Sequence, residues 1–128
     1  MKPTHPVELL VCAIGTQEGE LTSHTNNNPG NLRFAHQLNA TRPDGTTSGT
    51  LEDEPIAIFD SWADGICALF RDVWAKVAQK MTVRELISTY APPNENNTTV
   101  YLADVLEWTE LPPDTHIVDL LPPLFKMN

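Results

Sequence analysis

The sequence contains no hydrophobic run long enough to cross a bilayer. Among its 128 residues, the apolar stretch Val7–Ile14 is interrupted by Glu8, and it is far shorter than the roughly 20 residues of a membrane span. The chain also lacks the basic and apolar opening of a signal peptide, because Pro-Thr-His-Pro occupies residues 3–6. We therefore expect no membrane insertion, and we expect any action outside the cytoplasm to depend on another delivery route.

Basic residues are scarce as well. Eight lysines and arginines stand against 17 aspartates and glutamates, which gives a formal net charge of −9. Such a chain repels a phosphate backbone unless it carries a local basic patch. The only loose basic group, Arg71, Lys76, Lys80 and Arg84, is spread along expected helix. We therefore expect no nucleic-acid partner, whereas a neutral sugar polymer remains an acceptable ligand.

Cysteine occurs only twice, at Cys12 and Cys67, and both residues lie in apolar helical patterns. We expect two buried, reduced thiols, with a disulfide between two helices as the alternative. The four histidines are scattered and show no short ligand spacing with one another or with the cysteines. The sequence therefore predicts no metal site, and we expect no cofactor.

The length and the 41% of hydrophobic residues fit a single domain, residues 1–128, that buries one core without disulfides or metals. Helical spacing of apolar residues predicts a first helix from Pro6 to about Gly19, capped by residue 4 or 5. Two apolar islands follow, Leu32–Phe34 and Ile56–Phe59. We expect them to pair as short strands, with a turn at Asp44-Gly45 between them.

The second helix is expected to begin after Asp60 or Ser61. Its wide apolar stripe consists of Trp62, Ile66, Leu69, Phe70, Val73 and Val77. We expect Trp62 to belong to the core because it lies on this stripe. A substrate-stacking role for its indole ring is the alternative.

Three further signals place the remaining helices. Thr82 and Glu85 form a capping box that predicts the start of the third helix, and two prolines at residues 92–93 end it. The fourth helix begins near residue 97 or 98. We expect Asp114 to cap a short last helix. The sum is an α+β fold, mostly helical, with a small β-hairpin inserted after the first helix.

Glu18 breaks the apolar pattern of the first helix. It lies four residues after Ile14 and eleven after Val7, and roughly 100° per residue puts it about 20° from the direction of Val7. Burial and the helix C-terminus would both disfavour the charged form of a carboxyl group there, which suits a general acid. The alternative is a half-exposed glutamate that is hydrogen-bonded or solvated.

Two polar segments follow the first and third helices. Residues 26–31 hold four asparagines, a proline and a glycine. Pro29 fixes φ, Gly30 permits positive φ, and the amides both donate and accept hydrogen bonds. The segment is either a structural loop or a rigid polar wall for a sugar chain. The second segment, residues 90–99, is either a stiff connection between helices or a second part of a binding surface.

Together these segments resemble the lysozyme-like proteins of phage virions and prophage-carrying bacteria, small relatives of goose-type lysozymes and soluble lytic transglycosylases. The resemblance covers roughly residues 7–105. Its motifs are Ala13-Ile14, Glu18-Gly19, Asn27-Asn28-Pro29-Gly30-Asn31-Leu32-Arg33, Phe59, Gly65-Ile66, Ala68, Tyr90-Ala91-Pro92-Pro93, Glu95-Asn96, Thr98 and Tyr101. It implies a lysozyme-like fold and cleavage of the β-1,4 bond between N-acetylmuramic acid and N-acetylglucosamine in peptidoglycan.

Residue by residue, the resemblance makes Glu18 the catalytic general acid and base. The substrate-binding residues that it implies are Asn27, Asn28, Asn31, Tyr90 and Glu95. Among them, Tyr90 falls where related transglycosylases have a tyrosine that supports the catalytic carboxylate. The sequence departs from the family at Gly19, where many transglycosylases have serine, and in residues 35–55, which are longer and more acidic than expected.

Two outcomes of the reaction stay open. If a second carboxylate activates water, the product is an inverted reducing sugar. Without one, Glu18 acts as the base while the 6-hydroxyl of the sugar closes an anhydro ring. The candidates for a second carboxylate are Glu95, which we favour, Asp44, Glu20 and the cluster Glu52, Asp53 and Glu54.

The partner implied by the resemblance is the glycan strand of peptidoglycan. We expect the protein to act at the bacterial cell wall and to be delivered by a virion, a secretion system or lysis. The rival class is a catalytically inactive lysozyme-like module that binds the wall or builds a virion.

Overall fold

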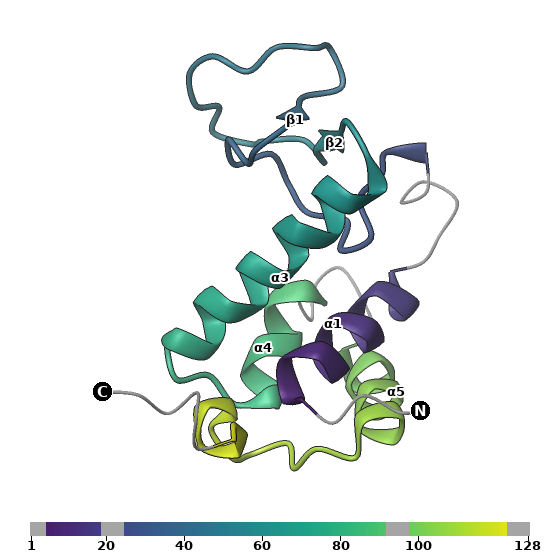
Figure 1. Ribbon diagram of the computed structural model, residues 1–128, viewed down its shortest axis with the longest axis vertical. Coiled ribbons are helices and arrows are strands. Elements are labelled where there is room, and N and C mark those ends of the chain that lie inside the picture. Colours follow the sequence, from purple (N-terminus) through teal and green to yellow (C-terminus); the bar gives the residue numbers. More distant parts are fainter. Residues whose placement is uncertain (1–4, 19–24, 92–97, 123–128) are drawn as a thin grey trace. The chain divides into compact units, whose positions relative to one another are not determined.

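Four α-helices and one small sheet make up the regular structure of residues 5–18, 25–91 and 98–122, which the computed structural model describes (Figure 1). The elements are α1 (Pro6–Gln17), β1 (Ala40–Thr41), β2 (Ile58–Phe59), α3 (Trp62–Ala78), α4 (Val83–Tyr90), α5 (Thr98–Thr109) and the 3-10 helix η1 (Ile117–Leu120). This content confirms the expected α+β class.

The chain divides into two compact units. The first contains residues 1–13 and 72–128, and the second contains residues 14–71. The boundaries fall within α1 and α3. No helix in the described ranges combines the length and the apolar character that crossing a bilayer requires.

Local capping signals set the starts of α1 and α4, both in the first unit. His5 Nδ1 accepts a hydrogen bond of 3.1 Å from the Val7 amide and so caps α1. At α4, Thr82 Oγ1 accepts from the Glu85 amide at 3.1 Å, and the Glu85 carboxylate accepts from the Thr82 amide at 2.9 Å. The predicted capping box is therefore confirmed.

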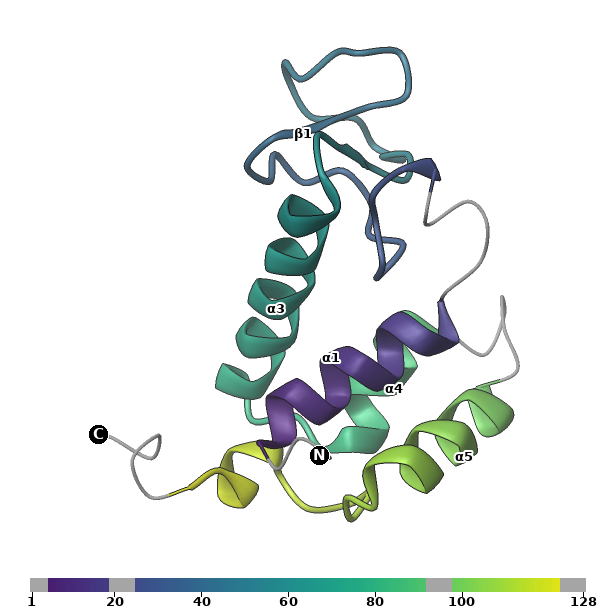
Figure 2. The same cartoon turned by 45° about the vertical axis from the view of Figure 1, so that its right-hand side comes forward.

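The core of the first unit forms where α4 packs against α5 (Figure 2). Leu86, Ile87 and Val105 are fully buried. The chain returns to the start of α4 at η1, because the Ile117 amide donates to the Met81 carbonyl at 2.9 Å. The buried contact with α5 therefore holds α4 itself, and the bond from Ile117 holds the segment just before α4.

The expected role of Asp114 is wrong. η1 follows His116 and has no side-chain cap. Asp114 instead pairs with Arg84, whose Nε lies 2.7 Å from its carboxylate. A carboxylate beside a guanidinium gains a charge-assisted hydrogen bond, and this bond lowers the pKa of Asp114.

The sheet of the second unit pairs β1 with β2 in antiparallel register, with Ala40 opposite Phe59 (Figure 1). The expected first strand, Leu32–Phe34, makes only an isolated bridge between Arg33 and Ile56. The expected turn is present, since the Gly45 amide donates to the Arg42 carbonyl at 2.8 Å and Gly45 has a φ of +84°. β1 has only two residues and follows a polar sequence, so no alternating apolar pattern predicts it.

A buried arginine organises the long connection between the two strands. Arg42 is only 3% exposed, and it binds the Glu54 carboxylate through Nε at 2.8 Å and through Nη2 at 3.1 Å. Its other hydrogen bonds go to Thr46 Oγ1 at 3.2 Å, to the Ser48 carbonyl at 3.0 Å and to the Gly49 carbonyl at 2.8 Å. The guanidinium also lies 4.6 Å from the centroid of the Phe34 ring. Residues 43–53 are exposed, but several of them are hydrogen-bonded to the buried guanidinium group of Arg42.

Expectations about three side chains are wrong. Cys12 and Cys67 are exposed and are not joined in a disulfide. Each lies roughly 140–160° around its helix from the buried stripe, so an apolar neighbourhood in sequence did not mean burial. Trp62 is 39% exposed. On the expected apolar stripe of α3, Leu69 is buried, Ile66 is only partly buried and Trp62 is exposed.

The second unit also depends on a close backbone approach. A Cβ atom at Gly65 on α3 would lie 1.9 Å from the Asn27 carbonyl oxygen. At Gly15 on α1, a Cβ atom would lie 4.0 Å from the Cβ atom of Pro29, an ordinary contact. Both glycines face the same loop, but only Gly15 leaves room for a side chain.

Gly65→Ala is expected to lower the free energy of unfolding by at least about 1–3 kcal/mol, because the added methyl group overpacks a rigid backbone contact. Gly15→Ala is the matched control and should be neutral or stabilising by up to about 1 kcal/mol, since alanine favours helix. Urea unfolding of both variants measures the difference. Equal stability of the two variants would contradict the close approach.

Glu54→Gln tests the buried ion pair through its pH dependence. The Arg42 side chain and the Leu51 amide lower the pKa of Glu54 to about 2. A lowered pKa stabilises the fold fully above the ordinary value of about 4.3 and stops doing so as the pH falls through the folded-state value. The stability gap between the native protein and Glu54→Gln should therefore be constant near neutral pH and shrink below about pH 4.3. Glu52→Gln, at an exposed neighbour, should show no such gap.

Candidate functional site

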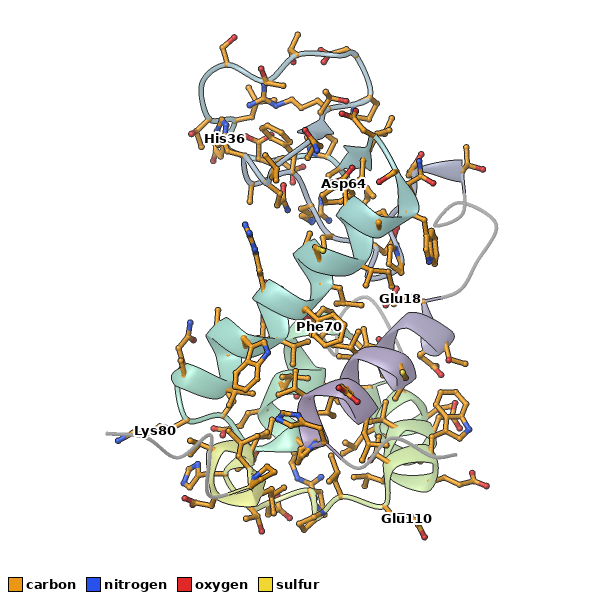
Figure 3. All side chains as sticks on the ribbon, in the orientation of Figure 1. Glu18, His36, Asp64, Phe70, Lys80 and Glu110 are labelled. Carbon is orange, nitrogen blue, oxygen red and sulfur yellow. The ribbon has the colours of Figure 1, made fainter. Side chains whose placement is uncertain are left out.

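Glu18 directly follows α1 and is half-buried. Its amide continues the helical hydrogen bonding by donating to the Ile14 carbonyl at 2.8 Å. Ile14 itself is fully buried. Figure 3 shows Glu18 at the C-terminal end of α1. Glu18 thus lies at the end of a buried helix face and is itself only partly exposed to solvent.

Asn28 is the structural centre of the asparagine loop, residues 26–31. Its side chain is fully buried. Nδ2 donates to the carbonyls of Leu32 and Ala57, both at 2.9 Å, while Oδ1 accepts from the Leu32 amide at 2.8 Å. These three bonds use the side-chain amide within the protein. Asn28 therefore supports the loop and does not present its amide to a ligand.

Asn27 ties the same loop to β2. Its Nδ2 donates to the Phe59 carbonyl at 3.1 Å, and the Phe59 amide donates to the Asn26 carbonyl at 2.9 Å. Asn27 is half-buried and has a φ of 52°, in the left-handed region that asparagine tolerates better than most residues. Its side-chain oxygen remains chemically able to accept a hydrogen bond.

Asn31 has the opposite exposure to Asn28. It is exposed, has a φ of 52°, and donates its backbone amide to the Asn28 carbonyl at 3.0 Å. Within the described ranges, no hydrogen bond holds its side-chain amide. The loop thus presents Asn31 on a backbone that Asn28 fixes.

The asparagine loop also meets the helix that ends at Glu18. Gly15 lies about one turn before Glu18, and a Cβ atom added there would be 4.0 Å from the Cβ atom of Pro29. On the other side, Gly65 lets the Asn27 carbonyl approach α3. The loop is therefore bonded to β2, packs closely on α3 and lies near the C-terminal end of α1, all within residues 14–71.

Tyr90 belongs to the other unit, where it is half-buried at the end of α4. Its hydroxyl group donates to Asp72 Oδ2. Sequence analysis missed Asp72, although its spacing of four residues from Lys76 on a helix predicts an ion pair. Glu95, the other predicted residue of this polar segment, lies outside the described residues.

The candidates for a second carboxylate are bound to other side chains, are exposed, or lie outside the described residues. Glu54 is held by Arg42. Asp44 accepts from Thr46 Oγ1 at 2.7 Å, a bond that lowers its pKa. Glu52 and Asp53 are exposed, and Glu20 lies outside the described residues, as Glu95 does. The favoured candidate, Glu95, stays a prediction.

No group of three or more metal-ligating side chains occurs in the part of the chain that the structure describes. The chain matches no protein-family model, no curated protein and no solved structure. The lysozyme-like resemblance therefore depends on the residues themselves.

Asn28→Ala and Asn31→Ala separate the two roles of asparagine in this loop. Asn28→Ala leaves one amide and two carbonyl groups without their partner, so it should lower the free energy of unfolding by roughly 1–3 kcal/mol or more. Asn31→Ala removes an exposed side chain and should change stability by less than about 0.5 kcal/mol. Thermal and urea unfolding compare the two. A harmless Asn28→Ala would contradict the structural role.

Proposed function

We propose that this protein cleaves the glycan strands of peptidoglycan at the β-1,4 bond between N-acetylmuramic acid and N-acetylglucosamine, with Glu18 as general acid and base. The observation that carries the proposal is the position of Glu18. Glu18 is a half-buried residue that directly follows a buried helix face, and the asparagine loop lies near the last turn of that helix. That is the residue type and setting that the lysozyme-like resemblance implies.

In this proposal Glu18 donates its proton to the glycosidic oxygen while positive charge develops at the anomeric carbon of the muramic acid. The exposed amide of Asn31 and the side-chain oxygen of Asn27 supply hydrogen bonds to sugar hydroxyl and acetamido groups. Asn28 keeps these two residues in place. The lysozyme-like fold and the action at the bacterial wall belong to the same proposal.

The reaction ends in one of two ways. A water molecule activated by a second carboxylate gives a reducing sugar, whereas deprotonated Glu18 accepts the 6-hydroxyl proton when an anhydro ring closes. Both endings begin with protonated Glu18, but only the ring closure also uses deprotonated Glu18 as the base. Mass spectrometry of released muropeptides distinguishes them, because the anhydro product lacks the mass of one water molecule.

The second candidate function is a lysozyme-like module that binds the wall without cleaving it. The net charge of −9 favours a module that is tethered to a larger assembly, because electrostatic attraction does not bring an acidic protein to anionic bacterial surfaces. Such a module would co-sediment with purified walls and release no muropeptides.

Glu18→Gln should remove the activity and leave the fold intact. General acid catalysis contributes about 10²–10⁴-fold to rate, so the release of muropeptides from purified peptidoglycan should fall at least about a hundredfold. Glu8→Gln is the matched control, because Glu8 is an exposed glutamate on the same helix, and it should release muropeptides at the native rate.

The circular dichroism spectrum and the unfolding midpoint of Glu18→Gln should match those of the native protein. If this variant clears a peptidoglycan suspension as fast as the native protein does, Glu18 is not the catalytic acid. If the native protein binds walls but releases nothing, the binding module is the correct function.

A further inference from the structure

Residues 35–55 have no part in the proposed chemistry, although they are longer and more acidic than the lysozyme-like resemblance implies. They include the loop that leads out from β1 and returns to β2 (Figure 1). Leu38 is 68% exposed, the highest value for a large apolar side chain among the described residues, and Leu51 is 51% exposed. A single exposed leucine is ordinary, but hydrogen bonds hold the backbone around both of these.

Leu38 lies between two residues whose side chains are hydrogen-bonded within the same unit. Before it, Gln37 Nε2 donates to the Arg33 carbonyl at 2.9 Å. After it, Asn39 Nδ2 donates to Asp64 Oδ1 at 3.1 Å. The backbone that carries the most exposed leucine is therefore fixed on both sides.

Leu51 is held by the buried ion pair. Its amide donates to Glu54 Oε2 at 2.8 Å, and Arg42 binds the same carboxylate. Arg42 Nη2 also donates to the Gly49 carbonyl at 2.8 Å, two residues before Leu51. A residue that is already ordered loses less conformational entropy when it binds a partner. Both leucines are thus prepared for a contact outside the chain.

The stretches that carry the two leucines lie side by side. Arg33 Nη1 donates to the Glu54 carbonyl at 2.8 Å, and Arg33 forms an isolated bridge with Ile56. Leu38 follows Arg33 closely in the sequence, and Leu51 shortly precedes Glu54. Each leucine is therefore only a few residues from the same contact.

The exposed charges of this region are mostly negative. Within residues 33–55, all of which the structure describes, the exposed carboxylates are those of Asp44, Glu52 and Asp53. The only exposed guanidinium group in that range belongs to Arg33, which lies 3.8 Å from Asp53, because Arg42 is buried. Such a surface attracts a basic partner and repels a second copy of this acidic chain.

We propose that residues 35–55 form a docking surface for a basic, apolar segment of another protein. Leu38 and Leu51 pack against the apolar side chains of that segment, and Glu52 and Asp53 pair with its lysine or arginine side chains. The inference goes beyond the proposed function, because docking requires no cleavage and involves neither Glu18 nor the asparagine loop. Such a partner supplies an attachment that an acidic protein does not gain from anionic walls.

A helical peptide of lysine and leucine, with its leucines along one face, is the probe. The native protein should bind it saturably in titration calorimetry. The double variant Leu38→Ala with Leu51→Ala should raise Kd at least about tenfold, because two apolar contacts are lost. Glu52→Gln with Asp53→Asn should raise Kd about twofold to tenfold at low salt. High salt should abolish this second difference and preserve the first, because salt screens exposed charges.

Val100→Ala is the matched control, because Val100 on α5 is also 51% exposed, and it should keep the native Kd. The same peptide with glutamate in place of lysine should not bind. All variants change exposed side chains, so their unfolding midpoints should match that of the native protein. Release of muropeptides by the leucine double variant should equal the native rate, so docking and cleavage are tested separately.

Three results would overturn the inference. The first is that the lysine–leucine peptide does not bind, or binds the leucine double variant with the native Kd. The second is that Val100→Ala weakens binding as much as the leucine changes do, or that the glutamate peptide binds as well as the lysine peptide. The third is a native dimer in sedimentation that the leucine changes dissociate, because the occupant would then be a second copy of the chain.

Discussion

The buried amide of Asn28 is the interaction on which the candidate site depends. A buried side-chain amide is costly unless its donors and acceptor are satisfied, and here three backbone bonds to Leu32 and Ala57 satisfy it. Those bonds join the asparagine loop to the segment that leads into β2. The loop also lies near α1, since a Cβ atom added at Gly15 would be 4.0 Å from the Cβ atom of Pro29, so the bonds of Asn28 hold a segment close to the end of the helix that precedes Glu18.

In residues 14–71 the apolar core is small, and buried hydrogen bonds and an ion pair provide much of the stabilisation. The sheet pairs only two residues per strand, and a two-stranded ribbon of that size is not stable by itself. Its apolar cluster is small: Phe34, Ala40, Ala57, Phe59 and Ala68, with Leu32 against it. Asn28 on one side and the Arg42–Glu54 pair on the other fix the backbone around it. The Arg42–Glu54 pair and the other hydrogen bonds of Arg42 therefore fix a large part of the long, acidic region 35–55.

Local signals were enough to predict the helices, but contacts between distant residues were not. The capping box at Thr82 and the first helix from Pro6 depend on neighbours in sequence. β1 carries too few residues for a period of two to show. The Asp72–Tyr90 contact joins residues 18 positions apart, and no spacing rule indicates it. Glu18 could be singled out because a carboxylate on an apolar helical stripe is a local anomaly.

The asparagine loop shows why residue type alone could not assign the site. Asn28 and Asn31 are three residues apart, yet one amide is used inside the protein and the other is exposed. The difference lies in their partners, because the Asn28 amide bonds to Leu32 and Ala57, whereas no hydrogen bond among the described residues holds the Asn31 side chain. A rigid loop loses little conformational entropy when its exposed amide binds a ligand. The internal bonds of Asn28 therefore prepare Asn31 for binding, so a single loop supplies both the support and the recognition that the proposed chemistry requires.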